Sequence, residues 1–110
     1  MTIKELKILL NSAEDESLRR FDYPAAEKIC LSILEAIAPA EDTAEIREIR
    51  ALTHVVLGDA LMRQGKTNEV ALGYALSGLT AAKEYNYPDI EARATGLVGS
   101  IYRWQDDYLR

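Results

Sequence analysis

The sequence has little of the chemistry that metal sites and active sites require. It contains one cysteine, one histidine and one tryptophan in 110 residues. A single cysteine, Cys30, can form neither an internal disulfide nor a paired-cysteine zinc site, and it is expected to be a small residue of the core. A single histidine, His54, supplies no recognisable metal or catalytic set and is interpreted as a half-buried packing residue. These absences predict a non-enzymatic chain without metal or cofactor.

Long hydrophobic runs are also lacking. The longest uncharged stretch, residues 70–82, contains two glycines and is shorter than the roughly 20 apolar residues that a membrane span needs. The first ten residues include charged side chains and only a short apolar run, so no signal peptide is expected. With a single cysteine, this pattern predicts a cytoplasmic protein that does not insert into a membrane.

The sequence has fewer basic than acidic residues. Thirteen lysines and arginines stand against eighteen acidic residues, which gives a formal net charge of -5. The basic residues form no stripe of the kind that a phosphate backbone requires. A nucleic acid is therefore not expected as a partner.

Apolar residues recur at helical spacing along the whole chain. Ile3, Leu6 and Leu10 follow steps of three and four, and so do the apolar residues after Ile46. No segment alternates as a strand does, and short polar breaks separate the periodic segments. The sequence therefore predicts an all-α fold of five antiparallel helices, near 2–19, 24–38, 43–64, 67–86 and 89–105.

The expected helix boundaries have local causes. Pro24 and Pro88 suit a first helical turn, where an amide has no partner to lose. Asp42 followed three residues later by Glu45 has the form of a capping box. Gly65 can adopt the left-handed conformation that ends a helix, so the third helix is predicted to end there.

Two segments, 51–66 and 92–107, match at an offset of 41 residues. Each contains a small residue, then an apolar residue followed by glycine, then a large apolar or aromatic residue one turn later, and then glutamine before a predicted turn. Such self-similarity indicates a repeat architecture. The matched residues are Leu57, Gly58 and Leu61 in the first copy and Val98, Gly99 and Tyr102 in the second.

This pattern resembles the tetratricopeptide repeat (TPR), whose first helix carries a Leu-Gly pair with Leu or Tyr one turn later. The offset of 41 exceeds the about 34 residues of the common form. It is similar to the long-repeat variety found at the N-termini of bacterial signalling proteins. The resemblance implies an α-α superhelix, a right-handed solenoid of helical hairpins. Residues 1–110 are then expected to form a single TPR-like domain, the N-terminal part of a longer repeat array.

Four glycines fall inside predicted helices. Glycine in a helix interior costs about 1 kcal/mol relative to alanine. Close approach of neighbouring helices would offset that cost at Gly58, Gly73, Gly78 and Gly99. The uncharged fourth helix, which contains two of them, is expected to be covered on several sides by the third and fifth helices, with a second chain as a further possible cover.

A loose match to a phosphate-binding loop ends in Gly65-Lys66-Thr67. A phosphate-binding loop follows a buried strand and leaves its backbone amides free. The residues before Gly65 continue a helical pattern instead, so a helix-ending turn is predicted here.

In the TPR family the first helix of each hairpin lines a concave groove. The residues that face it by resemblance combine apolar side chains with methionine, arginine and tryptophan, a composition typical of interfaces. Apolar or acidic residues stand where chaperone-binding members place a carboxylate clamp, so that specificity is not carried over. The expected groove residues are Leu52, Val55, Val56, Asp59, Met62, Arg63, Arg93, Leu97, Ser100, Arg103 and Trp104.

The resulting hypothesis is a non-catalytic protein-protein interaction module that binds a protein or peptide ligand, with a sensory or regulatory role at the N-terminus of a bacterial signalling protein. The alternative is a self-assembling helical domain that forms a homodimer. A turn is expected after Gln105, and an uncovered apolar face of the fifth helix would then supply the dimer contact. That face is expected to contain some of Ile101, Tyr102 and Leu109.

Overall fold

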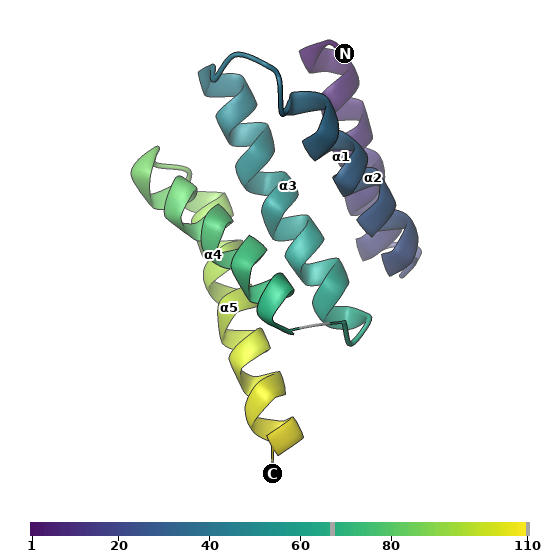
Figure 1. Ribbon diagram of the computed structural model, residues 1–110, viewed down its shortest axis with the longest axis vertical. Helices are drawn as coiled ribbons and strands as arrows, with labels where there is room; N and C mark the ends of the chain where they lie inside the picture. The colour runs from purple at the N-terminus through teal and green to yellow at the C-terminus, as the bar shows by residue number, and fades with distance from the viewer. Residues whose placement is uncertain (67, 110) are drawn as a thin grey trace.

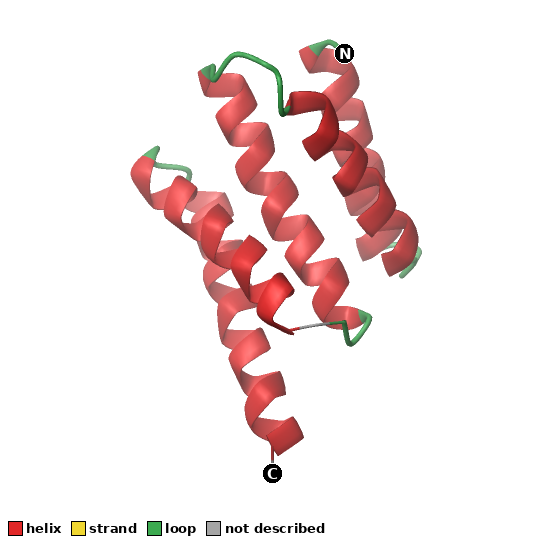
Figure 2. Ribbon diagram, viewed as in Figure 1, coloured by secondary structure: helices red, strands yellow, loops and turns green. Residues whose placement is uncertain are grey.

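In the computed structural model, residues 1–66 and 68–109 are described, with their side chains up to Trp104. This part of the chain forms five helices and no strand (Figure 2). The all-α fold class with five antiparallel helices is confirmed. The helices are α1 (Ile3–Leu18), α2 (Tyr23–Ile37), α3 (Ala44–Arg63), α4 (Asn68–Glu84) and α5 (Pro88–Leu109).

Local capping explains where the helices begin and end. Thr2 caps α1 in a complete capping box with Glu5, a cap that was not predicted. Asp42 does not cap α3: Thr43 takes that position, and its side chain accepts a hydrogen bond from the backbone N–H of Ile46. The expected capping box of Asp42 and Glu45 is therefore wrong, because Asp42 lies one residue too early and pairs with arginines instead.

Left-handed residues end three of the helices. Gly65, with φ of 68°, ends α3 as predicted, and the Lys66 N–H donates to the Leu61 carbonyl. Asn86 and Phe21 adopt the same conformation, with φ of 60° and 56°. Asn tolerates this region, whereas for Phe it is strained. The backbone of α5 continues to Leu109, so the turn expected after Gln105 is wrong.

The helices form two layers, and α3 is the central helix of one of them (Figure 1). Each helix packs on the next one along the chain, and α3 also packs on α1 and on α5. Within the described part of the chain, α2 and α4 do not contact each other. The odd-numbered helices therefore form one continuous layer, while α2 and α4 lie separately on its other side. α3 contacts all four other helices.

Small residues bring α3 and α4 close together. A Cβ atom on Gly58 would lie 3.0 Å from the Ala71 carbonyl oxygen, and one on Gly78 would lie 2.6 Å from Val55 Cγ2. The predicted close approach is thus confirmed at these two glycines. It is wrong for Gly73 and Gly99, where an added Cβ would meet nothing within 4 Å.

The core follows α3 from end to end. Its largest completely buried side chains include Ile33 and Ile37 of α2, Leu57 of α3 and Ile101 of α5. The buried Thr53 hydroxyl donates to the Ile49 carbonyl at 2.6 Å, so its polar group is satisfied. The expectation that the third and fifth helices cover α4 is confirmed, because α4 packs on both α3 and α5. Its outer side remains exposed at Val70, Gly73 and Leu76.

None of the described helices combines the length and the apolar character needed to cross a membrane.

Candidate functional site

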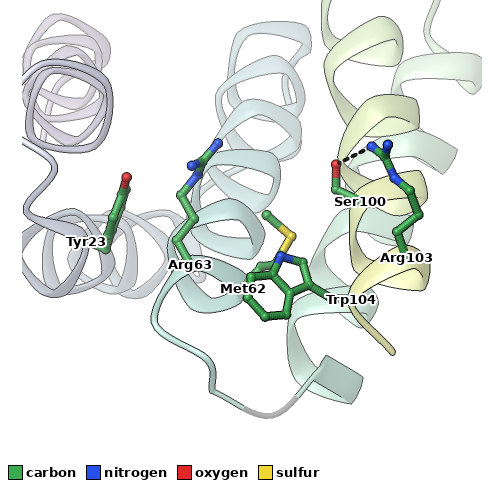
Figure 3. A pocket seen from close by; sticks show the side chains of 6 residues that line it. All are labelled: Tyr23, Met62, Arg63, Ser100, Arg103 and Trp104. Carbon is green, nitrogen blue, oxygen red and sulfur yellow. Dashed lines mark hydrogen bonds between the residues drawn. The ribbon is translucent and has the colours of Figure 1, made fainter. Parts of the chain in front are cut away.

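An open hollow of about 580 Å³ lies at the end of the bundle where α3 ends (Figure 3). It is formed by the last turn of α3, the C-terminal half of α5 and the first residue of α2. Its lining residues are Tyr23, Met62, Arg63, Ser100, Arg103 and Trp104.

Five of these six residues were predicted as groove residues: Met62, Arg63, Ser100, Arg103 and Trp104. They come from two segments that are about 40 residues apart in the sequence, and the packing of α3 on α5 brings them to one place. The sixth, Tyr23, was not predicted as a site residue. The sequence did contain a usable signal, because antiparallel packing of α2 and α3 must place the start of α2 near the end of α3.

Arg63 is fixed by an ion pair on one side and an aromatic ring on the other. Its Nε atom donates to both carboxylate oxygens of Asp59 at 3.2 Å. Its guanidinium carbon lies 5.7 Å from the centre of the Tyr23 ring. The Asp59 charge raises the pKa of Arg63, so the guanidinium stays positive at every physiological pH. The hollow thus has a permanently charged, oriented donor at one side.

The opposite side of the hollow combines charge with exposed apolar surface. Arg103 donates from Nη2 to the Ser100 hydroxyl at 3.5 Å, and Figure 3 shows this pair on the α5 side. Trp104 is 56% exposed, although tryptophan buries most of its surface in a typical fold. Met62 is 7% exposed and forms the floor. A tryptophan between two arginines over a methionine is a composition enriched in binding interfaces.

Three other predicted residues lie on the same layer but outside the hollow. Leu52 borders a separate hollow of about 230 Å³ between α1 and α3. Asp59 pairs with Arg63 and accepts a hydrogen bond from Ser17 of α1 at 3.5 Å. Arg93 of α5 forms an ion pair with Glu14 of α1, so the two helices are linked across α3.

Four predicted residues do not face solvent. Val55 and Val56 are each 2% exposed and Leu97 is 6% exposed. Val55 packs on Gly78 of α4, and Leu97 Cδ2 lies beside Gly58. Their assignment to an open groove is wrong, because four helices cover α3 around Val55 and Val56 and because Leu97 of α5 packs against α3. Ile101 is also completely buried, so its assignment to an uncovered dimer face is wrong as well.

The other two residues expected on a dimer face are Tyr102 and Leu109. Tyr102 is 49% exposed and points away from the core. The side chain of Leu109 lies outside the described residues. Ala92, Gly96 and Gly99 are exposed on the same helix, so this side of α5 is flat and made of small residues next to one aromatic ring.

Two residues with possible reactivity have structural roles. Cys30 is completely buried, and its burial raises the pKa of the thiol to about 12, so it is a core residue as predicted. Lys66 follows the helix-ending turn and forms an ion pair with Glu27 at 2.8 Å. Because the amides before Gly65 are used within α3, this segment is a helix end and not a phosphate-binding loop.

No family model, no curated protein and no solved structure matches this chain.

Proposed function

We propose that the chain is a non-catalytic protein-protein interaction module and that the hollow between α3 and α5 is its binding site. The observation that carries this proposal is the exposed Trp104 beside Arg63 and Arg103, over a methionine floor. The volume of about 580 Å³ lies within the range of roughly 300–1,000 Å³ that is typical of ligand-binding clefts. The TPR-like resemblance of the sequence supports the same role, including its sensory or regulatory version.

The chemistry of the hollow indicates the kind of ligand. Two guanidinium groups flank the tryptophan, and guanidinium forms paired hydrogen bonds with carboxylates. We infer that the ligand is a peptide segment with one large apolar side chain next to one or more acidic residues. The apolar side chain packs on Trp104 and Met62, while the acidic residues reach Arg63 and Arg103.

A peptide selection on the whole protein tests this proposal. Peptides displayed from an unbiased library are selected on the wild-type chain, and the binding of selected peptides is then measured with Trp104→Ala and with Tyr102→Ala. Tyr102 is the matched control because it is an equally exposed aromatic residue of α5 outside the hollow. Losing a central aromatic contact should weaken binding about 30-fold or more, whereas the control should change it little.

The single tryptophan provides a second readout. Peptide binding over Trp104 should shift its fluorescence to shorter wavelength and protect it from a soluble quencher. The proposal fails if selection yields no peptide, if acidic peptides are not enriched, or if the Trp104 and Tyr102 variants bind equally well.

A specific observation also favours the second candidate function, a self-assembling domain. In the repeat, Ala92 and Gly99 of α5 correspond to Ala51 and Gly58 of α3. The face of α3 that carries Ala51 and Gly58 packs closely on α4, while the corresponding face of α5 is exposed. We propose as the alternative that a second copy of the chain covers this face of α5.

The two glycines with free space provide a matched test of self-association. Gly99→Leu places a bulky side chain on the exposed face of α5, and Gly73→Leu places the same side chain on the outer side of α4. A dimer through α5 should dissociate with the first variant and persist with the second, as measured by sedimentation equilibrium. A wild-type chain that stays monomeric at all accessible concentrations would rule this alternative out.

A further inference from the structure

A second cluster of basic side chains lies on the side of α3 that faces α4. Arg47, Arg50 and His54 follow one another at steps of three and four, so they share one face of the helix. They border a hollow of about 110 Å³, which has room for only a few water molecules. The remaining lining residues are Asp42, Ala51, Ser77, Ala81 and Tyr85.

The two arginines of this cluster share a single carboxylate. Arg50 Nη1 lies 3.1 Å from one oxygen of Asp42, and Arg47 Nη1 lies 3.7 Å from the other. Arg47 Nε is buried and has no hydrogen-bond partner among the described residues. A buried N–H without an acceptor costs about 1–3 kcal/mol. The two arginines therefore have more N–H donors than Asp42 accepts.

The arginines are also held in position. The Arg47 guanidinium carbon lies 4.5 Å from the centre of the Tyr85 ring, an arrangement that stabilises the cation and limits its rotation. The Arg50 and Arg47 side chains are 35% and 29% exposed, so both are partly shielded from solvent. Asp42, by contrast, lies in the loop before α3 and its side chain is 59% exposed. It can swing outward without disturbing the core.

Local charge favours an anion here although the whole chain is acidic. Two arginines and one aspartate give the cluster a net charge of one positive unit, and the imidazole of His54 beside them is neutral. Fixed guanidinium groups suit oxygens of a tetrahedral oxyanion, because their N–H groups form charge-assisted hydrogen bonds with paired oxygens. The Ser77 hydroxyl, on the α4 side of the hollow, is a further donor.

We propose that this hollow binds a phosphate-type oxyanion between Arg47 and Arg50, with Ser77 and His54 at its edge. The bound anion replaces Asp42 as the acceptor of hydrogen bonds from the two guanidinium groups, and the Asp42 side chain turns to solvent. The small volume admits the phosphate group alone, so a larger phosphorylated molecule would leave its remainder outside. This site is separate from the hollow at the end of α3, and it does not depend on the proposed peptide binding.

The single histidine makes the site directly observable. In the free protein, burial and the Arg50 charge lower the pKa of His54, whose ring also packs 5.5 Å from the Tyr74 ring. Arg47, Arg50, Asp42 and Tyr85 are the other ionisable groups around the hollow. NMR spectra of the full chain are recorded while inorganic phosphate replaces chloride at constant ionic strength. A saturable shift of the imidazole signals is expected, together with a rise in the His54 pKa on the order of half a unit.

Three variants separate specific binding from general charge effects. Arg50→Gln should weaken phosphate binding about tenfold, the effect of losing one charge-assisted hydrogen bond. Arg19→Gln is the matched control, because it removes the same charge from an exposed arginine at the end of α1, outside the lining of this hollow, and should leave binding unchanged. Asp42→Asn should strengthen binding, because the competing carboxylate is gone.

The proposal is overturned if His54 shows no saturable response, if Arg50→Gln and Arg19→Gln have equal effects, or if Asp42→Asn weakens binding. A comparison with O-phosphoserine distinguishes two sources of the same group. Tighter binding of O-phosphoserine supports a phosphate group carried on a larger molecule, and tighter binding of inorganic phosphate supports the free ion.

Discussion

Replacing Gly78 with alanine tests the close packing of α3 on α4. The new Cβ would lie 2.6 Å from Val55 Cγ2 and 3.0 Å from the Ala51 carbonyl oxygen. The backbone oxygen cannot yield unless α3 itself moves, and overpacking of this kind costs about 1–3 kcal/mol. The gain in helix propensity offsets about 1 kcal/mol of that cost. We therefore expect the free energy of unfolding to fall by up to about 2 kcal/mol.

Gly73→Ala is the matched control for this experiment. Gly73 lies in the same helix, is exposed, and has nothing within 4 Å of an added Cβ. Only the propensity gain remains there, so the free energy of unfolding should rise by about 0.5–1 kcal/mol. Urea unfolding followed by far-UV circular dichroism measures both variants. The packing argument is refuted if the two substitutions change the free energy of unfolding in the same direction.

Three further predictions concern residues with unusual environments. Phe21→Gly should raise the free energy of unfolding by about 0.5–1 kcal/mol in the same urea assay, because it removes left-handed strain from a residue that is 66% exposed; a decrease would mean that the ring makes a stabilising contact. Cys30 should react with a thiol reagent only as fast as the protein opens, because burial raises its pKa to about 12, so the rate should increase steeply with urea; fast labelling of the native chain would contradict this. His54 has a lowered pKa in the folded state, so the unfolded chain binds a proton more readily and stability should decline as the pH falls from about 7.5 to about 5.5. His54→Gln should flatten this part of the profile, and an unchanged slope would show that other groups cause it.

Much of the fold could be predicted because its signals are local. Helical spacing, Pro24, Pro88 and Gly65 act within a few residues, and the structure places helix boundaries close to them. The cap of α3 shows the limit of this reasoning. Asp42 and Thr43 are both good caps by residue type, and the choice between them depends on Arg47 and Arg50, which attract the carboxylate.

The candidate site could be predicted only where one side of a helix stays open. Arg63, Arg103 and Trp104 lie at the end of α3 and in the C-terminal half of α5, where the neighbouring helices leave them exposed. Met62 and Ser100 line the same hollow although they are less exposed. In the middle of α3 the predicted groove residues are buried, because four neighbouring helices cover successive residues from Val55 to Leu57 and leave no single apolar stripe. Such all-round burial follows from the tertiary packing and cannot be read from spacing alone.

The contacts among the five helices also bear on how the chain acquires its structure. Every backbone contact between described helices joins two consecutive helices or two helices that are separated by a single helix. The chain segments that must close for these contacts to form contain at most one intervening helix, so the entropic barrier is low and folding should be rapid. During synthesis on a ribosome, α1, α2 and α3 have one another as partners before α4 emerges. Each later helix then finds its docking surface already assembled.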